Sequence, residues 1–291
     1  MPTTSPRARP SQHAALHDED CILVLQGGGA LGAYQAGVFE SLSRVYREPT
    51  WVAGISIGAI NAALIAGNAA PHRVARLREF WELVSSALPT PLLAAHAGAR
   101  ESLNEASASQ VMLFGVPGFF RPRFPPAPLQ PRGSLEAISF YDTAPLRETL
   151  ERLVDFDRIN AGPLRLSVGA VNVRNGNFEY FDSTKQTIDA RHIMASGALP
   201  PGFAPVEIDG EHYWDGGYTG NPALAPLYLG TQASDLIVVG INPIVRSEVP
   251  QTARAIIDRI GEISFNASFM GEVAAIAFFE ELMQSLPADR K

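Results

Sequence analysis

The sequence has little of several features that would mark out particular classes of protein. It contains a single cysteine, Cys21, so no internal disulfide can form, and its six histidines show no paired spacing that would predict a zinc or iron–sulfur site. The 23 Lys and Arg residues against 30 Asp and Glu residues give a net charge of −7, which disfavours nucleic acid as a partner. No apolar run reaches the length of about eighteen residues that crosses a bilayer. These absences predict a cytoplasmic protein without a bound metal ion.

The composition that is present is that of one large globular domain. Apolar residues make up 46% of the 291 residues, which is enough for a full core. Residues 1–20 lack the apolar centre of a signal peptide, so we expect a disordered tail, followed by a single domain over residues 21–291. Within this domain, clustered prolines and weak periodicity over residues 89–133 predict an irregular, lid-like insertion. Residues 243–291 are expected to form a helical extension.

Apolar runs alternate with segments of helical periodicity along the chain. The runs at 21–26 and 235–240 predict buried parallel strands. The dipeptide Asn175-Gly176 predicts a tight hairpin between strands at 164–173 and 177–182. Strands that alternate with helices predict an α/β fold, a three-layer α/β/α sandwich with a mostly parallel central sheet.

The first predicted strand runs into a glycine-rich turn, GGGALG at residues 27–32. Its spacing fits the G-x-G-x-x-G pattern of dinucleotide-binding proteins, in which an acidic residue at the end of the second strand binds the ribose. Here the second strand ends in Ala53-Gly54, without an acidic residue. We therefore reject a dinucleotide site, and no organic cofactor is expected.

A second glycine motif, GISIG at residues 54–58, follows the second strand and precedes a helix. The pattern G-x-S-x-G at such a junction is typical of a nucleophile elbow. The sharp turn that exposes Ser56 brings Gly54 and Gly58 against each other, which leaves no room for a Cβ. The positive end of the following helix favours negative charge at the serine. Ser56 is therefore the candidate nucleophile.

The glycine turn gains a function beside such a serine. A serine that attacks an ester needs backbone N–H donors directed at the developing oxyanion. Gly27, Gly28 and Gly29 end the neighbouring strand at the same end of the sheet, and we expect their amides to form this oxyanion hole.

Two arrangements could activate Ser56. One is a triad such as Ser56, Asp182 and His212, in the chain order of the α/β-hydrolases. The other uses Asp215, which follows a short strand and precedes Gly216 and Gly217. Aromatic neighbours would desolvate this carboxylate, which raises its pKa and makes it a better base, and the flanking glycines would let the backbone approach the serine.

Together, the motifs GGGALG, GISIG and DGG at 215–217 resemble the patatin-like phospholipases, and so do the connecting stretches INAALIAGN and ASGALPPGFAPVEIDGEHYWDGGYTGNP. The resemblance covers roughly residues 21–242 and implies a Ser–Asp dyad. It implies that Ser56 is the nucleophile, that Asp215 is the base, and that the amides of residues 27–29 donate to the oxyanion. Many members carry Arg or Lys where this chain has Leu31, which removes a charge near the glycine turn.

The sequence and the resemblance together predict a serine acyl-ester hydrolase that acts on lipid-like substrates through an acyl-serine intermediate. The alternatives are an esterase or thioesterase for short acyl chains or polyesters, and a non-catalytic lipid-binding module. The phenylalanines of 89–133 are expected either to cover the acyl site or to fill the core. For the apolar tail at 251–288, packing on the domain, a homodimer contact and peripheral membrane contact remain open.

Overall fold

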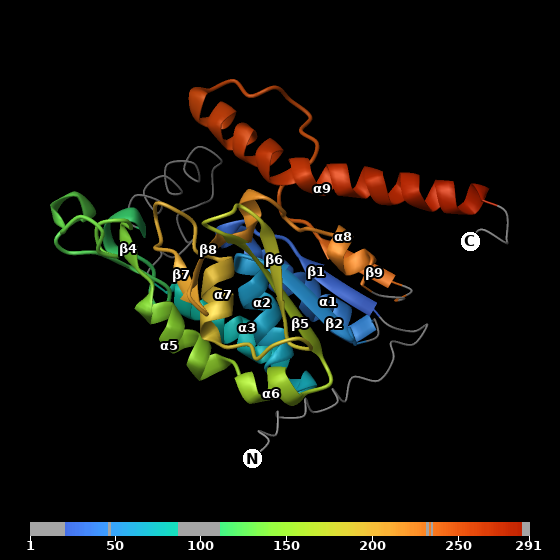
Figure 1. The fold of residues 1–291 in the computed structure, drawn as a ribbon, viewed down its shortest axis with the longest axis horizontal. Coiled ribbons are helices and arrows are strands. Elements are labelled where there is room, and N and C mark those ends of the chain that lie inside the picture. The colour runs from blue at the N-terminus through green and yellow to red at the C-terminus, as the bar shows by residue number, and fades with distance from the viewer. Residues whose placement is uncertain (1–20, 46–47, 87–110, 231–232, 234, 287–291) are drawn as a thin grey trace, which may run out of the picture.

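The computed structural model describes residues 21–45, 48–86, 111–230, 233 and 235–286 (Figure 1). The tail expected over residues 1–20 and residues 89–110 of the expected insertion lie outside the described residues. Seven strands of the described chain form one mixed sheet, in the order β7-β8-β5-β2-β1-β9 with β6 also paired to β5. Helices pack on both faces of this sheet, so the expected three-layer α/β/α architecture is confirmed.

Four neighbouring strands of the sheet are parallel to one another. They are β1 (Cys21–Leu25), β2 (Trp51–Ile55), β5 (Arg165–Asn172) and β9 (Asp235–Val239). All residues of β1 and β2 are buried, because helices cover both faces of these strands and their apolar runs are uninterrupted. Since parallel strands point the same way, the turns that follow β1, β2 and β9 emerge at one end of the sheet.

The edge strand β6 (Phe178–Asp182) runs antiparallel to β5. The two strands are joined by the Asn175-Gly176 turn, in which Gly176 has a φ of 73°, a value that glycine adopts without strain. The hairpin expected from these two residues is therefore confirmed.

The strand β5 is longer than its parallel neighbour β2, and its far end pairs with a third strand, β8 (Glu211–Asp215). Pairing with β2 ends at Gly169, and pairing with β8 begins at Ala170. Ala170 also pairs with Glu179 of β6, so β8 lies on the edge of β5 opposite β6, which is the edge that β2 occupies. The C-terminal ends of β2 and β8 therefore meet end to end on one edge of β5. The short strand β7 (Val206–Ile208) extends the sheet beyond β8.

Six helices pack on one face of the sheet around the larger core cluster. They are α1 (Gly32–Val45), α2 (Ile57–Ala66), α3 (Ala70–Ser85), α5 (Ala144–Leu153), α6 (Phe156–Ala161) and α7 (Ala190–Ser196). All ten residues of α2 are buried, because this helix lies between the sheet and the other helices and is apolar on every side. This helix begins directly after Ser56 and so holds one side of the predicted elbow in the core.

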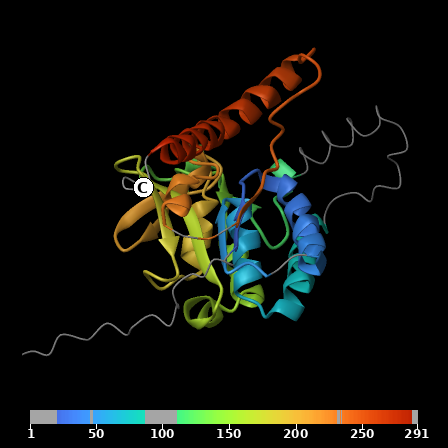
Figure 2. The ribbon, with the colours of Figure 1, turned by 90° about the vertical axis from the view of Figure 1, so that its right-hand side faces the viewer.

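The opposite face carries a smaller cluster, formed by alternate residues of β1 and β2 with α8 (Ala225–Tyr228) and α9 (Ala253–Ser285). The helix α9 begins after Thr252, whose hydroxyl accepts a hydrogen bond from the Ala255 N–H at 3.1 Å. In both ribbon views it runs along one side of the domain (Figures 1 and 2). No helix among the described residues combines the length and the apolar character needed to cross a bilayer.

The apolar side chains of α9 divide between the domain and the surface. Phe269 and Ile276 pack on the smaller core cluster, which is the first of the arrangements left open by the sequence. In contrast, several others are at least 40% exposed: Ile256, Ile257, Ile260, Ile263, Met270, Val273, Phe278, Phe279 and Leu282. The homodimer contact and the peripheral membrane contact stay predictions for this outer face.

The described part of the expected insertion, residues 111–133, contains more order than its composition predicts. It includes a helical turn at 111–114, the strand β3 (Arg121–Pro122), which pairs with β4 (Tyr141–Asp142), and a 3-10 helix at Ala127–Leu129. The segment is held by tertiary contacts between aromatic rings. These rings are Phe80, Phe119, Phe120, Tyr141 and Phe203. Such contacts leave no periodic pattern in the sequence.

Because α2 is fully buried, its stability contribution can be tested with a matched pair of leucines. We expect Leu64→Ala, in the C-terminal half of α2, to lower the free energy of unfolding by about 2 to 5 kcal/mol through the lost burial and the cavity left behind. Leu229→Ala, at a side chain that is 74% exposed, should change it by less than about 0.5 kcal/mol. Urea unfolding followed by circular dichroism measures both, and equal losses would contradict the packing described for α2.

Candidate active site

Ser56 occupies the junction between β2 and α2 in a strained backbone conformation. Its φ of 55° and ψ of −122° are rare for a residue with a side chain and cost of order 1 to 3 kcal/mol. Its N–H donates to the Ser196 hydroxyl at 2.9 Å, and that hydroxyl donates to the Gly169 carbonyl of β5 at 2.6 Å. The buried Ser196 side chain therefore ties the strained residue to the neighbouring strand.

The two glycines that flank Ser56 are required by close backbone contacts. A Cβ on Gly54 would lie 2.3 Å from the Gly58 carbonyl oxygen, and a Cβ on Gly58 would lie 2.2 Å from the Leu25 carbonyl oxygen of β1. Neither contact involves a side chain that could move aside. The elbow therefore packs against both its own glycine partner and the neighbouring strand.

Asp215 reaches Ser56 because of the register of the sheet. Ile55, which precedes the serine, lies opposite Gly169, while Asp215 lies opposite the next residue of β5, Ala170. The Ser56 side chain lies next to the Asp215 carboxylate, close enough to act on it as a donor that lowers its pKa. A second hydrogen bond comes from the Gly217 N–H to Asp215 Oδ1 at 2.8 Å.

Gly216 lets this part of the backbone approach β5. A Cβ on Gly216 would lie 2.5 Å from the Gly169 carbonyl oxygen, so no larger residue fits without moving β8 away from β5. The glycines after Asp215 thus have two separate tasks, since Gly216 permits the close approach and Gly217 donates to the carboxylate.

Burial dominates the electrostatics of the carboxylate. Removal from water raises the pKa of Asp215 to about 6, although the hydrogen bonds from Ser56 and Gly217 oppose this shift. At neutral pH the group is mostly ionised, and it is a stronger base than an ordinary aspartate.

The glycine turn after β1 lies beside Ser56, but its three amides are not equivalent. The Gly27 N–H donates to Asn221 Oδ1 at 2.7 Å, so it is not free to donate to an oxyanion. Of the three amides expected to form an oxyanion hole, those of Gly28 and Gly29 stay available as donors, because within the described residues their N–H groups donate to no protein group. Gly29 has a φ of 58°, as a glycine turn allows.

A cavity of about 620 Å³ connects these elements. Ser56, Asp215 and residues 27–29 line it together with a mostly apolar wall. The largest side chains of that wall are Phe80, Trp81, Phe119, Phe120, Phe203 and Phe265. A volume of this size holds a small organic ligand or an acyl chain, and the apolar wall favours the latter.

The alternative triad of Ser56, Asp182 and His212 is not assembled. Asp182 is paired with the Arg165 guanidinium and accepts a further hydrogen bond from Ser167, at the end of β5 remote from the elbow. His212 is exposed on β8, and no hydrogen bond joins a histidine to Ser56 within the described part of the chain. The buried His192 is engaged elsewhere: its Nδ1 accepts from the Asp189 N–H at the start of α7, and burial lowers its pKa.

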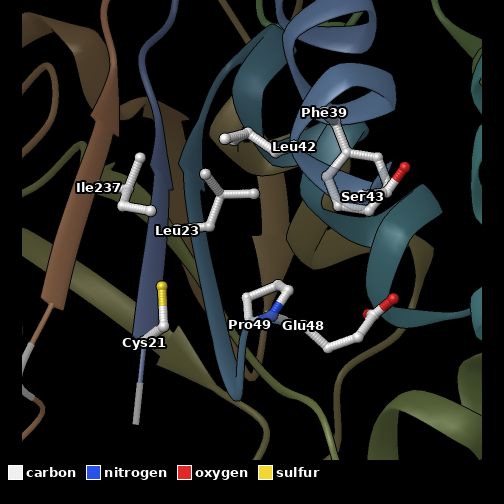
Figure 3. Close-up of a pocket in the computed structure, with 8 residues that line it drawn as sticks. All are labelled: Cys21, Leu23, Phe39, Leu42, Ser43, Glu48, Pro49 and Ile237. Carbon is white, nitrogen blue, oxygen red and sulfur yellow. The ribbon is translucent and has the colours of Figure 1, made fainter. Parts of the chain in front are cut away.

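Another hollow lies at the opposite end of β1, against the start of that strand (Figure 3). It has a volume of about 20 Å³ and is lined by Cys21, Leu23 and Phe39, among others, which is too little space for a ligand. Among the described residues, no three His, Cys, Asp or Glu side chains lie together so that they could hold a metal ion.

Several polar residues of the site were missed by sequence reasoning. Ser196 supports the elbow across 140 residues of chain, and Asn221 bonds to Gly27 across 194 residues. Gln26 and Asn242 belong to the same set of buried contacts. No local pattern signals these side chains, because each acts on backbone groups that only the folded sheet brings near.

Ser56 thus stands on a strained strand–helix turn beside a buried carboxylate and a glycine loop, an arrangement that favours the chemistry of a serine hydrolase. The model of the patatin-like phospholipase family matches residues 23–228, more than half of the 291 residues, and the chain belongs to this family. The resemblance noted in the sequence is thereby confirmed.

One curated relative is a cGAMP-activated phospholipase of Vibrio cholerae serotype O1, which is 24% identical over 229 residues. The matched region is 73% of this chain and 58% of that protein, so the chain spans less than two thirds of the length of this relative.

Among solved structures, VipD from Legionella pneumophila matches with 15% identity and a TM-score of 0.38, over 93% of this chain and 60% of that chain. ExoU of the Pseudomonas aeruginosa type III secretion system, in complex with SpcU, matches with 18% identity and a TM-score of 0.29, over 63% of this chain and 39% of that chain.

The raised pKa of Asp215 makes the stability of the fold depend on pH in a defined direction. Because the folded-state pKa of about 6 lies above the ordinary value, this group contributes stability at low pH that is lost as the pH rises to about 6. We compare the unfolding free energy of Asp215→Asn with that of the wild type at about pH 4 and about pH 8. The difference should shift in favour of the variant by up to about 3 kcal/mol from the lower to the higher pH, because only the wild type loses stability as Asp215 ionises.

Urea unfolding at the two pH values measures this gain. The exposed substitution Asp209→Asn controls for the loss of one carboxylate. A difference between Asp215→Asn and the wild type that stays constant with pH would show that Asp215 is not desolvated in the folded protein.

Proposed function

We propose that this protein is a carboxylic ester hydrolase that acts on acyl esters of lipid-like substrates, of the phospholipase A or lysophospholipase type, through a dyad of Ser56 and Asp215. The observation that carries the proposal is the pairing of Ser56 with a buried carboxylate of raised pKa at the wall of a large apolar cavity. Membership of the patatin-like phospholipase family supports the class of substrate.

The first half of the reaction acylates the serine. Ser56 Oγ attacks the ester carbonyl carbon while its proton passes to the Asp215 carboxylate, and the carbonyl oxygen becomes an oxyanion. The N–H groups of Gly28 and Gly29, together with the N-terminal end of α2, stabilise this charge. When the carbon–oxygen bond to the leaving alcohol breaks, the protonated Asp215 returns its proton to that oxygen.

The second half removes the acyl group. A water molecule attacks the acyl carbon and gives its proton to Asp215, which passes it to Ser56 Oγ as the carboxylic acid leaves. Because the carboxylate and the serine lie side by side at the wall of one cavity, the proposed mechanism needs no imidazole to carry the proton between them. The raised pKa supports both roles of Asp215, as acceptor and as donor, near neutral pH.

Two other functions remain as candidates from the sequence. An esterase or thioesterase for short acyl chains would use the same dyad but would gain little from the apolar cavity. A non-catalytic lipid-binding module would have no need for the strained backbone of Ser56, which lowers the stability of the fold. The apolar wall and the strain therefore favour hydrolysis of longer acyl esters.

The dyad can be tested by comparing carboxylate and histidine variants. Ser56→Ala and Asp215→Asn should each lower kcat/KM for a chromogenic medium-chain ester by at least ~10³-fold, because each removes a group that acts in the transition state. The double variant His192→Ala, His212→Ala should stay within about tenfold of the wild type. A fluorophosphonate should label Ser56, as peptide mapping by mass spectrometry would show.

Two results would count against this assignment. If the double histidine variant were inactive while Asp215→Asn kept its activity, an imidazole would be the base. A folded wild type that neither turns over the ester nor takes the label would leave only the lipid-binding alternative.

The aromatic wall should set the preference for chain length. Phe119 and Phe120 line the cavity, whereas Phe124 of the same segment is 94% exposed. We expect Phe120→Ser to lower the ratio of kcat/KM for a long-chain ester to kcat/KM for an acetyl ester by about tenfold. The variant removes apolar contacts that only a long chain makes. Phe124→Ser should leave the ratio unchanged, and an equal loss on both esters would indicate that Phe120 only fills the core.

A further inference from the structure

The side chain of Asn221 holds both backbone groups of Gly27, the first residue of the glycine turn. Its Oδ1 accepts from the Gly27 N–H at 2.7 Å, and its Nδ2 donates to the Gly27 carbonyl at 3.1 Å. Asn242 Nδ2 donates to the same carbonyl, also at 3.1 Å. Asn221 is fully buried, so these bonds are shielded from water.

The Gly27 carbonyl and the Gly28 N–H belong to one planar peptide unit. In a trans peptide these two groups point in opposite directions, so two donors that fix the Gly27 carbonyl also fix the direction of the Gly28 N–H. The first three residues of the turn, Gly27, Gly28 and Gly29, have no side chains that would limit their conformations, and glycine is the most flexible residue. The direction of the Gly28 amide therefore depends on the asparagines that hold its peptide plane.

The neighbouring residue Gln26 supports both asparagines. Its Nε2 donates to the Asn221 carbonyl and to Asn266 Oδ1 of α9, each at 3.0 Å. Its Oε1 accepts from the N–H groups of Ile241 at 2.8 Å and Asn242 at 3.1 Å. A polar cluster whose central side chains, Gln26 and Asn221, are buried and hydrogen-bonded makes a region rigid, because displacement leaves a buried polar group without a partner.

We propose that Asn221 is a positioning residue for catalysis, which orients the Gly28 N–H as an oxyanion donor by clamping Gly27. The assignment rests on the proposed hydrolase function. The two side-chain hydrogen bonds of Asn221 go to Gly27 and not to Ser56 or Asp215. Asn221 therefore acts on the transition state only through the peptide unit that it holds. Asn242 supplies the second donor to that unit, and the α9 residue Asn266 supports it through Gln26.

The chain offers a matched control for this clamp. Asn160 holds Ile188 in the same way, accepting from its N–H at 2.8 Å and donating to its carbonyl at 2.9 Å. Asn160 lies on α6, and neither residue lines the active-site cavity. Asn160→Ala therefore removes the same pair of hydrogen bonds, together with one from Asn160 Nδ2 to the Phe156 carbonyl at 2.7 Å, without touching the glycine turn.

We expect Asn221→Ala to lower kcat by about 10²-fold, the scale for loss of one oxyanion donor, with KM changed by less than about threefold. The inhibition constant of an acyl trifluoromethyl ketone, which forms a tetrahedral oxyanion on the serine, should rise by a similar factor. Asn160→Ala should lower the thermal midpoint but leave kcat and the inhibition constant within about twofold. Asn242→Ala removes one of the two donors to the Gly27 carbonyl, so its kcat should lie between those of Asn221→Ala and Asn160→Ala.

Asn221→Asp keeps the acceptor for the Gly27 N–H but loses the donor to the carbonyl and places a negative charge near the oxyanion. It should lose at least as much kcat as Asn221→Ala, and it decides the question if the alanine variant does not fold. The assignment is overturned if Asn221→Asp or Asn221→Ala behaves like Asn160→Ala, or if KM rises while kcat is kept. A wild type without ester turnover would instead overturn the proposed function itself, and with it this assignment.

Discussion

The site depends on the unequal lengths of β2 and β5. Because β5 continues for three paired residues after β2 has ended, the same edge can accept β8, and the two strands meet at Gly169 and Ala170. This meeting places the residue after β2 and the last residue of β8 side by side. The contact between Ser56 and Asp215 is thus a consequence of sheet register rather than of any property of the two loops alone.

The pairing of Ser56 with Asp215 is accompanied by backbone strain at the serine and by desolvation of the carboxylate. The backbone of Ser56 is strained, and it is held in this conformation by the buried helix α2 and by Ser196, which ties the elbow to β5. The carboxylate is removed from water, which raises its pKa and makes its ionised form costly in the folded state. Proteins commonly give up stability at sites where activity requires strain or desolvation, and both occur here within one pair of residues.

The predictions from sequence succeeded where a motif is local. The strand at 21–26, the Asn175-Gly176 hairpin and the junction of a strand and a helix at Ser56 follow from contiguous residues, because turn geometry and apolar periodicity act over a few positions. The family resemblance added the expectation that Asp215 works with Ser56, which composition alone left open beside a histidine triad.

What could not be predicted depends on contacts between distant parts of the chain. The Gly27 amide was expected in the oxyanion hole, but Asn221, 194 residues away, already accepts its hydrogen bond. Likewise, residues 111–133 gain order from the packing of Phe120 on Tyr141 and Phe203, with ring centroids 4.7 and 5.2 Å apart. Neither the polar clamp nor the aromatic cluster has a signature within a short window of sequence.

The most direct test of a carboxylate base in direct contact with the serine is the pH dependence of kcat/KM for the wild type and the double histidine variant. A base of raised pKa must be ionised to act, so the rate should rise along one limb with an apparent pKa near 6 and level off above it, identically in both proteins. A profile that is flat between about pH 5 and pH 8, or a limb that disappears when His192 and His212 are replaced, would contradict Asp215 as the base.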